Sequence, residues 1–137
     1  MNSMCRILAG FALCIAAAFA QSPSSQEVKV TFYHVPPAGM GSDSRGNIDG
    51  GVIGLKSPGE YKVVLYAHTD QWYVQPLDNA YYTALDTEGK WANWTHLGDR
   101  YAAVVVRPSY KPDKKTQALP PVGGDVIAEK DVPASEK

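Results

Sequence analysis

The chain has 137 residues, 45% of them hydrophobic, and its 13 basic and 14 acidic side chains leave a net charge of −1. Because the charges almost balance and no basic run or stripe occurs, the composition argues against a nucleic-acid-binding surface and against a surface for anionic lipids. The length allows one domain with a substantial core, but not two.

Residues 1–20 have the features of a secretory signal peptide. One arginine lies in a short N-terminal region, an apolar run follows over 7–19, and the letters AFA at 18–20 fit the A-x-A cleavage pattern. The run is too short for a membrane span, which needs about 20 residues. We therefore expect cleavage after Ala20 and a periplasmic or extracellular product. Lipid anchoring through Cys14 is the weaker alternative, since the residue before it is not the small one that a lipobox requires.

Cleavage at this point would also change what chemistry the chain can perform. Removing 20 residues leaves 117, with 12 basic and 14 acidic side chains and a net charge of −2. Both cysteines, Cys5 and Cys14, lie in the removed segment. The exported chain therefore has no disulfide, no thiol nucleophile and no thiolate metal ligand.

After the signal peptide, the apolar positions alternate or form short β-branched runs, which is typical of strands. We expect a first strand at 27–35, a glycine-rich strand or strand pair at 45–55, and the strongest strand at 60–68. Glycine inside a strand usually marks a bulge or a close approach of the backbone. Between the second and third segments, Pro58-Gly59 predicts a type II turn.

The second half of the chain continues the same pattern. Strands are predicted at 71–76, 80–86, 91–96 and 101–108. The loop at 87–90 is of the hairpin type, with Gly89 able to take a positive φ. Seven or eight short strands separated by turn signals predict one antiparallel β-sandwich of immunoglobulin-like type, with its core in 21–108. A jelly roll is the alternative.

The composition changes after Pro108. Residues 109–124 are polar and rich in proline and lysine, so we interpret them as a loop. Residues 125–132 could return as a final strand, and 133–137 are expected to form a disordered tail.

The strands at 60–68 and 101–107 are apolar on both faces. A two-layer sandwich needs only one apolar face for each strand, because the other face meets water. The second face is covered either by loops and the C-terminal segment of the same chain, or by a partner outside it.

Aromatic residues are concentrated in the middle of the chain. Ten of the twelve that follow the signal peptide lie between residues 61 and 110, including all three tryptophans. This exceeds the needs of one core, so we expect four or five rings on one surface. Alternation should place the two rings of each neighbouring pair on opposite faces. These pairs are Trp72 with Tyr73, Tyr81 with Tyr82, and Trp91 with Trp94.

Exposed rings of this kind favour a secreted, non-catalytic binding module for a carbohydrate or cell-envelope polysaccharide, because they can stack on sugars. Tyrosine and tryptophan are also favoured anchors of protein interfaces. The alternative is therefore a structural or interaction domain that docks an envelope protein, or a second copy, through the outer sheet face. The candidate stacking rings are Trp72, Tyr73, Tyr82, Trp91 and Trp94, and the candidate polar contacts are Asp70, Gln75, Asn93 and His96.

Two histidine–aspartate pairs are the best candidates for acid–base chemistry or metal binding: His68 with Asp70, and His96 with Asp99. Three scattered histidines give no zinc-ligand spacing, so we predict no metal site. The preferred interpretation has His68 hydrogen-bonded at a strand end and Asp70 capping a turn. No nucleophile elbow, Walker loop or dinucleotide fingerprint occurs. A small hydrolase is the minority hypothesis, with carboxylates drawn from Glu60, Asp78, Asp86, Glu88 and Asp99.

Residues 41–51 faintly resemble a calcium-binding loop, with Asp43, Asn47 and Asp49 as oxygen donors. The ligand order of an EF-hand and its terminal glutamate are missing. A flexible turn is the preferred interpretation, because aspartate, asparagine, serine and glycine each have roles in turns. No cofactor is expected, and calcium is kept as the alternative.

Two longer stretches carry a resemblance to a known kind of domain: YKVVLYAHTDQWYVQP and KWANWTHLGDRYAAVVVRPSY. Over about residues 45–110 the chain resembles a small bacterial secreted β-sandwich accessory module found with cell-envelope and carbohydrate-related proteins. The resemblance implies a periplasmic or extracellular, non-catalytic role, and it identifies no ligand or binding residue.

Overall fold

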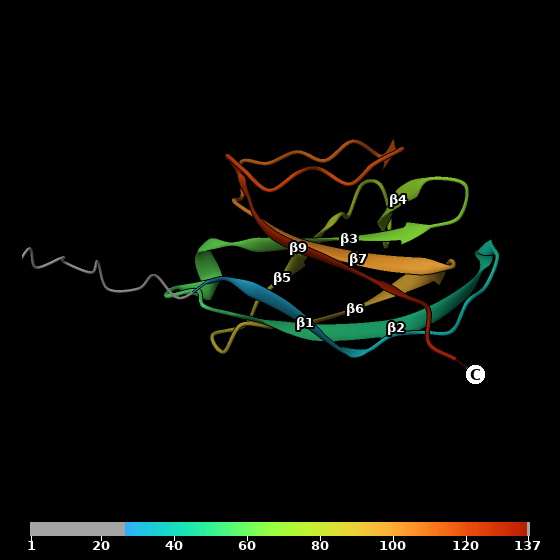
Figure 1. The fold of residues 1–137 in the computed structure, drawn as a ribbon, viewed down its shortest axis with the longest axis horizontal. Coiled ribbons are helices and arrows are strands. Elements are labelled where there is room, and N and C mark those ends of the chain that lie inside the picture. The colour runs from blue at the N-terminus through green and yellow to red at the C-terminus, as the bar shows by residue number, and fades with distance from the viewer. Residues whose placement is uncertain (1–26, 137) are drawn as a thin grey trace, which may run out of the picture.

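The computed structural model describes residues 27–136, which form two β-sheets packed face to face (Figure 1). The strands are β1 Lys29–His34, β2 Gly41–Ile53, β3 Lys62–His68, β4 Trp72–Gln75, β5 Tyr82–Ala84, β6 Lys90–Leu97, β7 Arg100–Val106, β8 Lys115–Thr116 and β9 Val126–Pro133. The smaller sheet has the order β1-β2-β6. The six-stranded sheet has the order β8-β4-β3-β7-β9, with β5 also paired to β3. All these pairings are antiparallel, and the predicted all-β sandwich is confirmed.

The connectivity is immunoglobulin-like. Lettered along the chain, the strands place A, B and E (β1, β2, β6) against C′, C, F and G (β4, β3, β7, β9). Tyr101 begins the buried part of β7, and its hydroxyl accepts the Gly98 N–H at 3.1 Å and donates to the Pro37 carbonyl at 2.8 Å. A tyrosine that ties this corner to backbone just upstream is a hallmark of such sandwiches.

The main core lies between the two sheets. Its members come from one face of each sheet: Val30, Ile48, Val52, Val63, Leu65, Ala67, Leu85, Trp91, Tyr101, Ala103, Val105 and Ala128. The glycine-rich part of β2 fits here because a Cβ at Gly50 would lie 2.5 Å from the Trp91 ring and would also meet the backbone of Thr31. The predicted close approach at this glycine-rich strand is confirmed.

A second buried cluster lies on the outer face of the six-stranded sheet. It contains Val64, Tyr66, Trp72, Val74, Ala102, Val104, Val106 and Val126. Residues 107–125, which we call the cover segment, run across this face (Figure 1). Tyr110 and Leu119 of the cover segment pack against the cluster, and the Tyr82 hydroxyl donates to the Pro108 carbonyl at 3.0 Å. The two-faced apolar strands are thus explained by coverage from the chain itself.

Several local predictions are wrong. The expected turn at 41–51 is part of the 13-residue strand β2, whose pairing with β6 shifts register between Gly41 and Arg45. Pro58-Gly59 begins a short 3₁₀-helix, η1 (Pro58–Glu60), instead of a type II turn. The hairpin-type loop before β6 is confirmed, with Gly89 at a φ of +79°.

The C-terminal part is more ordered than expected. Within the predicted loop, β8 pairs with β4. The predicted final strand is β9, which pairs with β7. Beyond it, the Ala134 and Ser135 N–H groups donate to the Asp99 and Pro36 carbonyls at 3.1 and 3.0 Å, so the expected tail docks on the sandwich up to this point.

The predicted signal peptide, its cleavage after Ala20 and the alternative at Cys14 lie outside the described residues. Within residues 27–136, no helix is long and apolar enough to cross a membrane.

Candidate functional site

A cleft lies at one open edge of the sandwich, between β4 of the larger sheet and β6, the edge strand of the smaller sheet. We call it the edge cleft. Its volume of about 410 Å³ falls in the range of about 300–1,000 Å³ that small-molecule sites occupy. It is lined by Ala67, Thr69, Tyr73, Val74, Gln75, Pro76, Leu77, Asp78, His96 and Leu97.

The cleft exists because the two sheets differ in width. Strand β4 extends the larger sheet beyond β3, whereas the smaller sheet ends at β6. Alternation along β4 sends Trp72 and Val74 to the outer cluster and turns Tyr73 and Gln75 toward the other layer. After Pro76 the chain leaves the edge of β3, in a turn closed by the Ala80 N–H on the Leu77 carbonyl at 3.1 Å.

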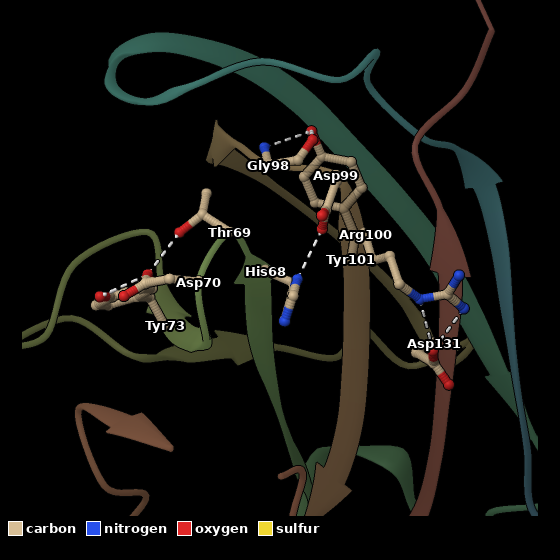
Figure 2. Close-up of polar contacts among 9 residues, drawn as sticks. All are labelled: His68, Thr69, Asp70, Tyr73, Gly98, Asp99, Arg100, Tyr101 and Asp131. Atoms are coloured by element: carbon tan, nitrogen blue, oxygen red, sulfur yellow. Dashed lines mark hydrogen bonds and ion pairs between the residues drawn. The ribbon is translucent and has the colours of Figure 1, made fainter. Parts of the chain in front are cut away.

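Tyr73 is held in place at its hydroxyl end. The hydroxyl donates to Asp70 Oδ1 at 3.0 Å, and Gln71 Nε2 donates to it at 3.5 Å. Thr69 Oγ1 donates to the same Asp70 oxygen at 3.0 Å (Figure 2). Hydrogen bonds from Tyr73 and then Thr69 lower the pKa of the Asp70 carboxyl, because they stabilise its charged form. The result is an oriented phenol ring beside an ionised carboxylate.

A second polar contact of the cleft joins Gln75 of β4 to His96 of β6. Gln75 Oε1 accepts the His96 backbone N–H at 2.8 Å and contacts His96 Nδ1 at 3.0 Å. Gln75 Nε2 donates to the Tyr73 carbonyl at 3.4 Å. Gln75 is 4% exposed, so its amide would be costly to leave unpaired. These contacts join the two sheets across the cleft and fix the orientation of the amide.

The histidines and aspartates pair differently from the candidate pairs of the sequence. His68 Nδ1 contacts Asp99 Oδ1 at 2.7 Å, whereas Asp70 turns away toward Thr69 and Tyr73 (Figure 2). His68 is therefore hydrogen-bonded at the end of β3, as expected, but its partner is Asp99. Among residues 27–136, no group of three or more histidine, aspartate, glutamate or cysteine side chains is placed to hold a metal ion.

The candidate calcium ligands are separated by the extension of β2. Asp49 Oδ1 contacts His34 Nδ1 at 2.9 Å, across the sheet. Asn47 pairs with Trp94 of β6, and Asp43 lies in the irregular part of the strand. In this extended strand the three side chains do not form the loop that the sequence resembles.

The structure brings five of the nine candidate ligand-binding residues together. Tyr73, Gln75 and His96 line the edge cleft, and Asp70 joins them through the Tyr73 hydroxyl. The Trp94 ring makes an edge contact with the His96 ring at 5.2 Å between centroids.

The other four candidates lie elsewhere. Trp72 is 8% exposed beneath the cover segment, and Trp91 is 3% exposed between the sheets. Tyr82 is half-buried against the outer cluster. Asn93 Nδ2 donates to Thr83 Oγ1 at 2.8 Å. Because Trp72 and Trp91 are buried, their indole rings cannot contact a ligand at the surface.

The sequence did not indicate Leu77 as a lining residue, and it indicated Asp78 only as a candidate carboxylate of a hydrolase. Both follow β4 in an irregular segment, where no strand periodicity marks their direction. Asp78 Oδ2 lies 3.4 Å from the Lys114 ammonium of the cover segment, a contact between residues 36 positions apart. A second hollow includes Tyr33, which at 53% is the most exposed aromatic residue of the described chain. Tyr33 lies outside the aromatic-rich stretch of residues 61–110, so the sequence pattern does not indicate it.

Comparisons of the chain with protein-family models, with curated proteins and with solved structures gave no match.

Proposed function

We propose that this protein is a secreted, non-catalytic glycan-binding module and that the edge cleft is its ligand site. One observation carries the proposal: a single cleft holds an oriented tyrosine ring, a paired amide and imidazole, and carboxylates at its rim. Ligand sites typically combine apolar walls with a few placed polar groups in this way.

The parts of the cleft match the two kinds of surface that a sugar presents. The face of the Tyr73 ring is suited to the C–H groups of a pyranose, and Leu77 adds apolar surface at the rim, where it is 44% exposed. Asp70, Asp78 and His96 offer oxygen and nitrogen atoms to hydroxyl groups. Because Asp70 and Gln71 hold the Tyr73 hydroxyl, little side-chain entropy is lost when the ring is covered.

The carboxylates support a binding role over hydrolysis. Glycoside hydrolysis normally uses two carboxyl groups, one of which keeps its proton because its pKa is raised. The pKa of Asp70 is lowered instead, by its hydrogen bonds from Tyr73 and Thr69. Asp78 is paired with Lys114. Neither side chain has the surroundings of a general acid.

The alternative role, docking through the outer face of the six-stranded sheet, is not favoured. That face is occupied by the cover segment, with Tyr110 and Leu119 packed into it. A partner would first have to displace these contacts.

The test is affinity electrophoresis through gels that contain a panel of soluble glycans. We expect retardation by at least one glycan, and a loss of at least tenfold in affinity for Tyr73→Ala and His96→Ala. The matched control is Tyr33→Ala, which removes an exposed ring from the other hollow and should leave affinity unchanged. Failure of every glycan to retard the protein would overturn the proposal, as would equal retardation of all three variants.

A further inference from the structure

A lysine lies beside the aromatic ring that lines one wall of the edge cleft. Lys115 of β8 is the direct partner of Tyr73 in β4. Residues opposite each other in an antiparallel pair have Cβ atoms about 4.5–5.5 Å apart and point to the same face of the sheet. Because Tyr73 lines the edge cleft, the Lys115 side chain leaves the backbone on the cleft side of the larger sheet.

The other wall of the cleft has a cation in a corresponding place. Arg45 of β2 is the direct partner of His96 in β6, and His96 lines the cleft. The Arg45 guanidinium lies 4.5 Å from the centre of the Trp94 ring, which contacts the His96 ring at 5.2 Å between centroids. Stacking on the face of a ring does not use the N–H groups of a guanidinium. Each sheet thus brings one cation to its side of the cleft.

These two cations are not matched by a carboxylate of the chain. Among the ion pairs of residues 27–136, none involves Lys115 or Arg45. Both side chains are exposed. Ammonium and guanidinium groups have only donors, so a ligand that satisfies them must supply acceptors. A negatively charged oxygen is the acceptor that suits both groups best.

The carboxylates of the cleft, by contrast, already have donors within the chain. Asp70 Oδ1 accepts the Tyr73 and Thr69 hydroxyls, each at 3.0 Å. Asp78 Oδ2 lies 3.4 Å from the Lys114 ammonium. The Lys114 charge offsets part of the repulsion that Asp78 would exert on an incoming anion. The remaining lone pairs of both carboxylates can accept hydroxyl groups of a sugar.

Resting on the proposed function, we infer that the edge cleft binds glycans that carry carboxylate groups, such as uronates, with Lys115 as the main contact of the carboxylate and Arg45 as the second cation. A hydrogen bond between an ammonium and a carboxylate is about twice as strong as one between neutral groups. A neutral sugar offers only a hydroxyl to the same ammonium. The hydroxyl groups of an acidic sugar remain available to Asp70 and Asp78, and its C–H face to Tyr73.

The experiment compares polymers that share a backbone and differ in charge: carboxymethyl-cellulose with hydroxyethyl-cellulose, and de-esterified with methyl-esterified homogalacturonan. Affinity electrophoresis at about 0.15 M salt, where attraction over longer distances is screened, measures each dissociation constant. We expect the acidic member of each pair to bind about tenfold more tightly, because hydrogen bonds between charged groups are stronger than those to a neutral hydroxyl.

Variants then test whether the two cations cause this preference. Lys115→Gln removes the charge and keeps a polar side chain, so the ratio of the two affinities should fall toward one, whereas Lys115→Arg should retain it. Arg45→Gln should lower the ratio by a smaller factor. Lys130→Gln is the matched control, because it removes one positive charge from β9, at the opposite edge of the larger sheet, and should leave the ratio unchanged.

Three results would overturn the inference while leaving glycan binding intact. One is a neutral polymer that binds as tightly as its acidic partner and loses affinity in Tyr73→Ala. Another is an unchanged ratio in Lys115→Gln. The third is binding to none of the four polymers together with retardation by another, uncharged glycan of the panel. Absence of binding to every glycan would overturn the proposed function, and the inference with it.

Discussion

The two faces of β4 lie in different surroundings. Trp72 and Val74 point into the outer cluster and are sealed by the cover segment, whereas Tyr73 and Gln75 point into the edge cleft. Each face carries one large aromatic ring, but the outer face adds a valine and the cleft face adds a glutamine. The sealed face and the open face therefore differ in what lies opposite the strand: a segment of chain in one case, and the edge of a narrower sheet in the other.

The first way to test this comparison is to remove an aromatic ring from the sealed face. Trp72→Ala should lower the free energy of unfolding by about 3–5 kcal/mol, because it leaves a cavity beneath the cover segment. Urea denaturation followed by circular dichroism gives the value. Trp94→Ala is the control, since that half-buried indole should cost only roughly 1–2 kcal/mol. Equal losses in the two variants would contradict a sealed face.

The next largest effect is expected where the cleft joins the two sheets. Gln75→Leu keeps a buried side chain of similar size but leaves the His96 backbone N–H without its acceptor. The loss should be about 1–3 kcal/mol, the usual cost of an unsatisfied buried donor. Amide hydrogen exchange at His96 should also become faster. Gln71→Leu, which changes a glutamine just before β4 that is not part of the cleft lining, is the control. Unchanged exchange at His96 in Gln75→Leu would contradict the assigned hydrogen bond.

A smaller effect is expected for the ion pair that connects the two faces. Asp78 of the cleft and Lys114 of the cover segment are 55% and 76% exposed at their side chains. Such pairs contribute about 0–1 kcal/mol and weaken in salt. A double-mutant cycle with Asp78→Asn and Lys114→Gln should give a coupling in this range that disappears in 1 M salt. A coupling free energy above this range that does not change with salt would show that the cleft face and the outer face of β4 are linked by more than this ion pair.

The smallest effect concerns a carboxyl group beneath the cover segment. Glu129 Oε2 is buried and makes no hydrogen bond within the described residues, and burial, followed by the nearby Asp131, raises the pKa of Glu129 above its usual value near 4.5. Above pH 4.5 the unfolded chain releases this proton more readily than the folded protein does, so the stability of the wild type falls as pH rises through the folded pKa.

Glu129→Gln removes this titration. The stability of the variant relative to the wild type should therefore increase from pH 4 to pH 7 in urea denaturation. Asp125→Asn, in the exposed end of the cover segment, is the control. A difference between Glu129→Gln and wild type that stays constant with pH would show that the carboxyl group does not titrate abnormally.

Much of the fold was predictable because alternation is a local property. The strands from Lys62 to His68 and from Arg100 to Val106 were found where their apolar runs lie, and both were correctly identified as apolar on two faces. The cover segment was not predictable. Its anchors, Tyr110 and Leu119, are single residues in a proline-rich stretch that has no period.

The candidate site was predicted only in part, for a related reason. The alternation of side chains along a strand places Trp72 and Tyr73 on opposite faces, and likewise Trp91 and Trp94, as the structure confirms. Alternation does not tell which of the two faces meets water. The cleft depends on where the smaller sheet ends, which is decided by the pairing of β6 with β2, far away in sequence. Tyr81 and Tyr82 both pack toward the outer cluster, because Tyr81 precedes the short strand β5.

The Gln75 amide has a consequence beyond the site itself. Open strand edges invite other chains to add to a sheet, which leads to fibres. Here the Gln75 side-chain amide accepts the His96 N–H on the free edge of β6. The short strand β8 pairs with β4 at the edge of the larger sheet. At the opposite side of the sandwich, a β-bridge joins Pro37 to Ser135. We therefore expect copies of this domain to stay separate at high concentration, without joining their sheets.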